Sequence, residues 1–90
     1  MGLRLVKTCD ACPEQYEAFC GQELVGYLRL RHGSFRVECP DAGGEIVYKA
    51  DTKGDGRFTD AERPEHLNAA LGAIEAWLTV RNGHDRGRPA

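Results

Sequence analysis

Long apolar runs are missing from this sequence of 90 residues. None approaches the ~20 residues that a helix needs to cross a bilayer. The opening MGLRLVKTCD also lacks the apolar core of a secretory signal. We therefore expect neither membrane association nor secretion, and we expect the protein in the cytoplasm.

The residue constellations of common enzymes are missing as well. There is no glycine-rich loop followed by Lys-Ser or Lys-Thr that could cradle a phosphate. The three histidines stand in an expected turn, at an expected helix start and in an expected tail, and no serine or cysteine is placed for them to activate. We therefore expect a protein that is not an enzyme and has no cofactor.

An excess of positive charge is also absent, because the formal net charge is −2. This value argues against a general nucleic-acid or membrane-surface binder, although a local basic patch remains possible. A content of 41% hydrophobic and 29% charged residues is that of a folded soluble chain. The length allows one domain with a single modest core.

What the sequence does contain is strand periodicity. ELVGYLRLR (23–31) alternates with period two, and SFRVEC (34–39) follows after His32-Gly33, a pair suited to a tight hairpin turn. With this turn, Leu30 faces Phe35, Arg29 faces Arg36 and Leu28 faces Val37. A slip of one residue would expose the apolar face, so the register is fixed.

Three further segments read as strands. They are a short one around Leu3 and Leu5, QYEAFC (15–20) and EIVYKA (45–50). The face that 15–20 presents to the core stays open: a three-residue loop after Cys20 buries Tyr16 and Ala18, and a two-residue loop buries Glu17 and Phe19.

The period changes to that of a helix from Pro64 onward. Apolar residues recur at intervals of three and four: Leu67, Ala70, Leu71, Ile74, Trp77 and Leu78. Asn82-Gly83 is a plausible C-cap. The sequence thus predicts an α+β fold, an antiparallel meander of four to five strands with one C-terminal amphipathic helix on one face. We expect a single domain over 1–82 and a disordered tail over 83–90.

The stretch DTKGDGRFTDAE resembles a calcium loop in its spacing. Asp51, Asp55, Gly56, Thr59 and Glu62 match positions 1, 5, 6, 9 and 12 of an EF-hand loop. Lys53 occupies position 3, where an oxygen ligand belongs, and a strand precedes the loop. The alternative is a turn followed by a Thr59–Glu62 capping box, and we prefer it.

Cys9 and Cys12 form a C-x-x-C pair that could hold half of a zinc site. Cys20 and Cys39 are poor candidates for the other half, because they lie on strands either side of 23–31, about 9.6 Å apart. We expect these two to fill the core. A redox role for the pair is disfavoured, because Pro13-Glu14 leads into a strand and not a helix.

Four side chains project from the other face of the central hairpin: Tyr27, Arg29, Arg31 and Arg36. Arg29 lies opposite Arg36, and like charges directly opposite each other are destabilising. Glu17, Glu38, solvent or an anionic partner could compensate.

A resemblance is carried by CDACPEQYEAF, by VGYLRLRHGSFRV and by GDGRF with the following ER. These strings resemble small uncharacterised bacterial and phage-associated proteins with a C-x-x-C-P-E-Q-Y opening and a G-Y-L-R-L-R-x-G hairpin. The resemblance spans about Cys9 to Leu78. It implies no activity, ligand or site residue.

The sequence thus predicts a small binding domain that uses the exposed basic face of its central hairpin. A protein partner is favoured over nucleic acid, because the chain is net acidic and glutamates interrupt the basic stripe. The alternative is a metal-stabilised module, with zinc at Cys9 and Cys12 or calcium in the loop from Asp51 to Glu62.

Overall fold

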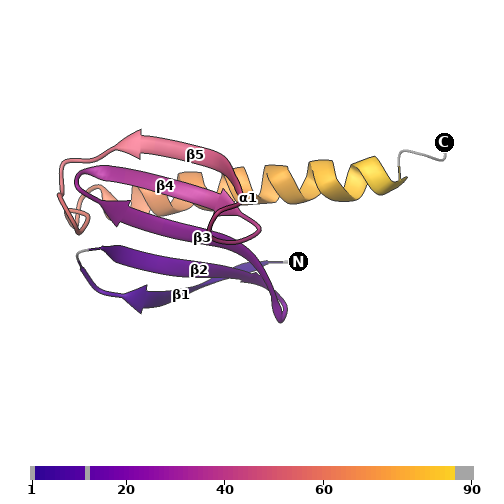
Figure 1. The fold of residues 1–90 in the computed structure, drawn as a ribbon, viewed down its shortest axis with the longest axis horizontal. Coiled ribbons are helices and arrows are strands. Elements are labelled where there is room, and N and C mark those ends of the chain that lie inside the picture. Colours follow the sequence, from indigo (N-terminus) through magenta and orange to yellow (C-terminus); the bar gives the residue numbers. More distant parts are fainter. Residues whose placement is uncertain (1, 12, 87–90) are drawn as a thin grey trace.

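Five antiparallel strands and one helix form the fold in a computed structural model that describes residues 2–11 and 13–86 (Figure 1). The elements are β1 (Leu3–Cys9), β2 (Glu14–Cys20), β3 (Glu23–Arg31), β4 (Ser34–Cys39), β5 (Glu45–Asp51) and α1 (Arg63–Arg86). The strands pair in chain order, β1-β2-β3-β4-β5. The helix packs on one face of this meander, so the predicted α+β architecture is confirmed.

The hairpin of β3 and β4 has the predicted bounds and register. Arg31 pairs with Ser34, Leu30 with Phe35, Arg29 with Arg36 and Leu28 with Val37. His32 and Gly33 have φ values of 54° and 73°. Positive φ at both central residues is the geometry of a type I′ turn, whose twist matches that of the flanking strands. The apolar residues of the hairpin face the core, and Leu28, Leu30, Phe35 and Val37 are fully buried.

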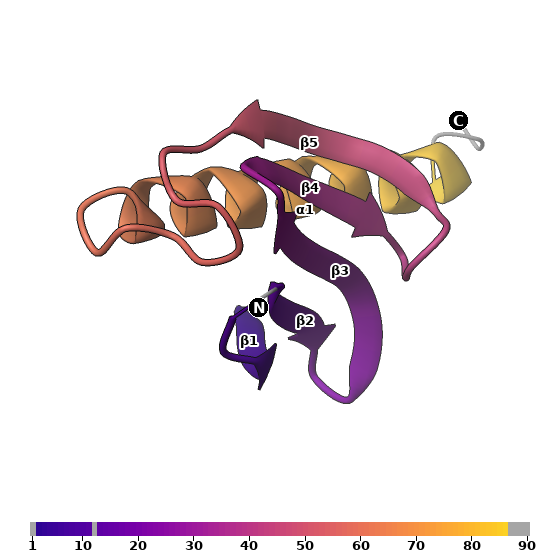
Figure 2. The ribbon, with the colours of Figure 1, turned by 60° about the vertical axis from the view of Figure 1, so that its left-hand side comes forward.

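The register of β2 against β3 contains a bulge at Val25. The turn after Cys20 has two residues, since Cys20 pairs with Glu23, yet Tyr16 and Ala18 are buried. Phe19 pairs with Leu24 and Ala18 pairs with Gly26, so Val25 has no partner in β2. This extra residue changes which side chains of the strand face the core. The expected alternation therefore fails at the start of β3, where Val25 is buried and Leu24 only half-buried. Figure 2 shows β3 bending along its length, so that β1 and β2 are turned away from β4 and β5.

The helix packs closely over β3, β4 and β5. Ala70 and Ile74 are fully buried, while Leu67, Trp77 and Leu78 pack against the edge of the core. The sheet leaves room for Ile74 at Gly26, where an added Cβ would lie 2.9 Å from Cδ1 of Ile74. The apolar periodicity thus predicted the buried side of the helix with the exception of Leu71, which is half-buried and does not belong to the core cluster.

The helix continues past the expected cap at Asn82-Gly83, to Arg86. Figure 1 shows its C-terminal end extending beyond the sheet. The predicted disordered tail over 83–90 is therefore wrong for 83–86, which continue the helix. Residues 87–90 lie outside the described residues, and their disorder stays a prediction. In the described part of the chain, no helix is both long and apolar enough to span a membrane.

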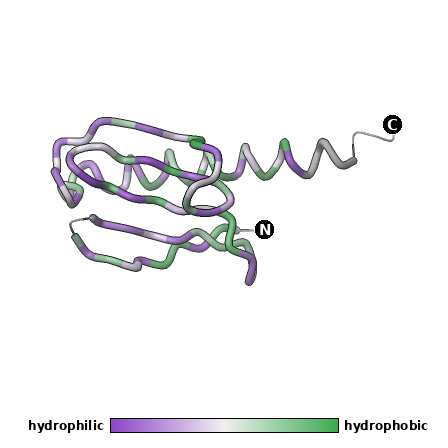
Figure 3. The backbone as a smooth tube through the Cα atoms, viewed as in Figure 1, coloured by the Kyte–Doolittle hydropathy of each residue, from purple (hydrophilic) through white to green (hydrophobic). Residues whose placement is uncertain are grey.

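The sheet has a second face, turned away from α1, which we call the outer face. Hydrophilic and hydrophobic residues alternate along the strands (Figure 3), and the alternation places polar side chains on this face. On β3 and β4 the outer residues are half-buried to exposed, whereas their neighbours in the chain are buried. Among the described residues, no element packs over the outer face.

Candidate functional site

Three cations lie side by side across the outer face. Arg29 of β3 pairs with Arg36 of β4, and Arg36 pairs in turn with Lys49 of β5. We call these three residues the basic row. Directly opposite side chains have Cβ atoms about 4.5–5.5 Å apart, so each cation has a like-charged neighbour within reach. The row therefore concentrates positive charge on a chain whose net charge is −2.

Neighbouring side chains orient and partly neutralise the row. The guanidinium of Arg29 lies over the ring of Tyr27, 6.0 Å from its centroid. The hydroxyl of Tyr27 donates to Oε1 of Gln15 at 2.9 Å. Nε of Arg36 lies 3.5 Å from a carboxylate oxygen of Glu38. Within the described residues, ion pairs include neither Arg29 nor Lys49.

The four predicted residues share the outer face. Arg31 lies two residues beyond Arg29 along β3, as Tyr27 lies two residues before it, and Arg31 pairs with Ser34, which pairs with Asp51. Lys49 was missed. The strand reading of 45–50 could have found it, but only with the register of β4 against β5, which includes a bulge between Val37 and Glu38.

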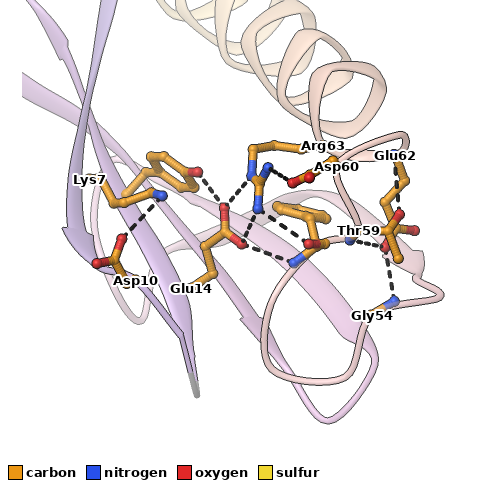
Figure 4. A network of polar contacts seen from close by, with 10 residues as sticks. Lys7, Asp10, Glu14, Gly54, Thr59, Asp60, Glu62 and Arg63 are labelled. Atoms are coloured by element: carbon orange, nitrogen blue, oxygen red, sulfur yellow. Dashed lines mark hydrogen bonds and ion pairs between the residues drawn. The ribbon is translucent and has the colours of Figure 1, made fainter.

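A buried polar network joins β2 to the loop before α1 (Figure 4). Glu14 is 0% exposed. Its carboxylate accepts a hydrogen bond from the hydroxyl of Tyr16, one from the amide of Phe58 at 2.9 Å and one from Nε of Arg63 at 2.9 Å. The sequence strings of the resemblance include Glu14 and Arg63, but nothing in the sequence pairs them, because they are 49 residues apart.

The network holds Glu14 as a carboxylate. Burial alone raises the pKa of Glu14, but the hydrogen bonds from Arg63, Tyr16 and Phe58 outweigh it and lower the pKa below its usual value. Burial and the nearby carboxylate raise the pKa of Tyr16, and the two acids raise that of Arg63. The carboxylate oxygens of Glu14 accept hydrogen bonds from groups of the protein itself. A buried polar network of this kind holds structural elements together.

Glu62, the last residue of the calcium-like stretch, is committed to the backbone. Its carboxylate accepts three hydrogen bonds of 2.9 Å, from the amides of Lys53, Gly54 and Thr59. The amide of Glu62 donates in return to Oγ1 of Thr59 at 3.3 Å. The predicted capping box is therefore confirmed.

The other acidic calcium candidates of the loop are Asp51 and Asp55. Asp51 ends β5 and lines the same open pocket as Thr59 and Glu62. The carbonyl of Asp55 accepts a hydrogen bond from the amide of Gly33. Within residues 2–11 and 13–86, no three His, Cys, Asp or Glu side chains come together as a metal-binding group. A calcium ion bound by Glu62 would have to replace its hydrogen bonds to the backbone.

Acid should remove the stabilisation that Glu62 provides. Burial raises the pKa of Glu62, but the amides of Lys53, Thr59 and Gly54 outweigh it and lower the pKa to about 2. Because this lies below the unfolded value of about 4.3, the contribution is complete above about pH 5 and is lost as the pH falls towards 2. Between these pH values, the free energy of unfolding of the wild type should fall by about 2–3 kcal/mol more than that of Glu62→Gln. Urea denaturation across pH 2–7 measures it, and parallel curves for the two proteins would contradict it.

The three described cysteines differ in burial. Cys39 is buried, whereas Cys9 and Cys20 are half-buried, so the expectation that Cys20 lies in the core is only partly met. Sγ of Cys9 lies 3.5 Å from the carbonyl oxygen of Ala11. Cys12 lies outside the described residues, and the zinc pair stays a prediction.

Cys39 is expected to react most slowly with a thiol reagent. Burial, and secondarily the carboxylate of Glu45, raise the pKa of Cys39 to about 11, and only the thiolate is reactive. In the native protein, Cys9 and Cys20 should be labelled well before Cys39, as mass spectrometry of timed samples would show. Equal rates at all three positions would mean that Cys39 is not buried as described.

A second surface feature is an open groove between β5 and α1. Its walls are mainly apolar: Ile46, Val47, Ala73, Ala76, Trp77 and Val80. Ile46 is 48% and Val80 69% exposed. At one end, Nε1 of Trp77 donates to a carboxylate oxygen of Glu45 at 3.2 Å. The groove offers packing surface without a cluster of ionisable groups.

Neither the family models, nor the curated proteins, nor the solved structures gave a significant match to the chain. The resemblance carried by the three sequence strings stays a prediction.

Proposed function

We propose that this chain is a small non-catalytic binding domain that engages an acidic protein partner through its outer face. The observation that carries the proposal is the basic row of Arg29, Arg36 and Lys49 in direct cross-strand register. Like charges in such positions destabilise a sheet. An anionic partner would relieve this repulsion on binding. It would also be recognised specifically, because the guanidinium groups of arginine can donate two hydrogen bonds to one carboxylate.

The surroundings of the row favour a protein over nucleic acid. Glu17 and Glu38 pair across the sheet with Tyr27, two residues along the strands from the row. A phosphate backbone lying over the row would pass close to both carboxylates. The net charge of −2 also lacks the long-range attraction that nucleic-acid binders use. A protein partner with a small acidic patch would contact the row without passing over these carboxylates. It would not depend on the net charge of the whole chain.

A cytoplasmic location agrees with this proposal. Cys9, Cys20 and Cys39 are free thiols, and the cytoplasm keeps thiols reduced.

Arg36→Glu tests the proposed function. Arg36 stands between Arg29 and Lys49, so the change replaces two repulsive cross-strand pairs by attractive ones and gives up the contact with Glu38. We expect the free energy of unfolding to rise by about 0.2–1 kcal/mol and the captured partner to be lost. Pull-down from a lysate followed by mass spectrometry, at low and moderate salt, measures the loss. Salt should weaken the wild-type complex, because exposed charges are screened.

Arg57→Glu is the matched control, because it changes the net charge equally in the exposed loop before α1. It should keep the partner. A partner retained by Arg36→Glu would contradict the proposal. Salt-sensitive binding of random DNA or RNA that Arg36→Glu abolishes would show that the partner is nucleic acid.

A further inference from the structure

We infer that the element which docks on the outer face is an acidic α-helix lying across β3, β4 and β5, with carboxylates at positions i, i+4 and i+7. This inference rests on the proposed function and specifies the chemistry of the partner. It follows from the spacing of the basic row, from the groups on one side of it and from the exposure of its members.

The spacing of the cations matches the spacing of side chains along a helix. Cross-strand neighbours have Cβ atoms about 4.5–5.5 Å apart, and helix neighbours at i and i+3 or i+4 have Cβ atoms about 5–6 Å apart. The row crosses two strand spacings, about 9.6 Å. A helix rises about 10.5 Å over seven residues. Three carboxylates on one helix face can therefore meet Arg29, Arg36 and Lys49 together.

An extended acidic segment does not fit the same row. Side chains on one face of a strand are two residues apart, about 6.6–6.8 Å. Three of them span about 13 Å, which is more than 3 Å longer than the row of about 9.6 Å. The helical rise of about 10.5 Å differs from the length of the row by only about 1 Å. A strand could place two carboxylates on the row but would carry the third past its end.

The neighbouring positions set the charge on the flank of the helix. Glu17, Tyr27 and Glu38 form the next cross-strand set, two residues along each strand. A helix centred on the basic row would turn one flank towards these residues. Carboxylates on that flank would be repelled by Glu17 and Glu38, whereas an apolar side chain could rest on Tyr27. We expect the acidic stripe of the partner to be narrow, with neutral or basic residues beside it.

The cations are available for such a contact. Lys49 is exposed, and the side chain of Arg36 is 38% exposed. Arg29 is half-buried and is held over the ring of Tyr27. A guanidinium that is already oriented loses less freedom on binding.

Three designed peptides of equal composition test the inference on the intact chain. The first is a capped alanine-glutamine helix with one terminal proline and with glutamates at i, i+4 and i+7. The second distributes the same glutamates around the helix. The third keeps the spacing of the first but moves a terminal proline to the centre, which breaks the helix. Fluorescence anisotropy at low salt gives the affinities.

The first peptide should bind about tenfold more tightly than the other two, since each exposed charge pair contributes modestly and three act together. Lys49→Glu should remove this preference, and Arg57→Glu should leave it unchanged. Equal binding of all three peptides, each weakened by Lys49→Glu, would overturn the helix and leave the acidic-partner surface in place. Absence of binding by the first peptide would also overturn the inference. The proposed function fails on different results, namely a captured partner that survives Arg36→Glu or a partner that is nucleic acid.

Discussion

Glu14→Ala is expected to lower the free energy of unfolding by about 3–5 kcal/mol, the cost of breaking a buried charged pair from one side. The carboxylate is 0% exposed and joins β2 to the loop and to the start of α1. Its removal leaves the side chain of Arg63, only 21% exposed, without its main partner. The amide of Phe58 and the hydroxyl of Tyr16 would lose their acceptor as well. Urea denaturation at neutral pH measures the change.

Asp60→Asn provides the control, because Asp60 pairs with the same arginine at 3.0 Å but has a side chain that is 93% exposed. Exposed pairs contribute little, so we expect a change below about 1 kcal/mol. Similar effects for the two substitutions would mean that burial of Glu14 is not what makes the network important.

Phe35→Ala should cost about 3–5 kcal/mol, the usual range for deleting a buried aromatic ring. Phe35 is fully buried and packs edge to face against Phe58 and Tyr48, with ring centroids 4.9 Å and 5.9 Å away. The substitution leaves a cavity where β4, β5 and the loop before α1 meet. Thermal and urea denaturation would show it.

Phe19→Ala is the matched substitution on the other face of the sheet. Phe19 is only half-buried, and its ring contacts the guanidinium of Arg4 at 5.0 Å. We expect a loss well below that of Phe35→Ala, about 1 kcal/mol or less, since little surface leaves water at this position. A larger loss for Phe19 would mean that the face assigned to solvent is covered.

The central hairpin could be predicted in full from the sequence because local rules determine it. The His32-Gly33 turn sets the register, and the burial of Leu28 and Phe35 on one face locks it. The helix was equally plain from its period. Both elements depend on contacts between residues near in sequence or on one repeating pattern.

The bulge at Val25 was not predictable in the same way. A two-residue turn after Cys20 pointed to Glu17 and Phe19 as core residues, and the bulge restores Tyr16 and Ala18 to that side. An unpaired extra residue leaves no periodic signal. The position of the bulge depends on how the whole sheet packs against α1.

Only part of the candidate site could be predicted from the sequence. Arg29 and Arg36 followed from the hairpin register, but Lys49 required the pairing of two strands separated by a loop and a bulge. Glu14 and Arg63 stood in the strings of the resemblance but had no signal that they pair, because an acid at the start of a strand and an arginine before Pro64 are ordinary in isolation. Long-range pairing of single side chains is decided by tertiary structure.

The most direct test of the central claim follows the side chains of both candidate surfaces at once. In the ¹⁵N-labelled protein, titration with the captured partner should shift the Nε–H signals of Arg29 and Arg36, because their guanidinium groups would donate to its carboxylates. The indole Nε1–H of Trp77, which lies in the groove between β5 and α1, should stay in place. Movement of the Trp77 signal with both arginine signals unchanged would contradict the account and assign binding to the groove.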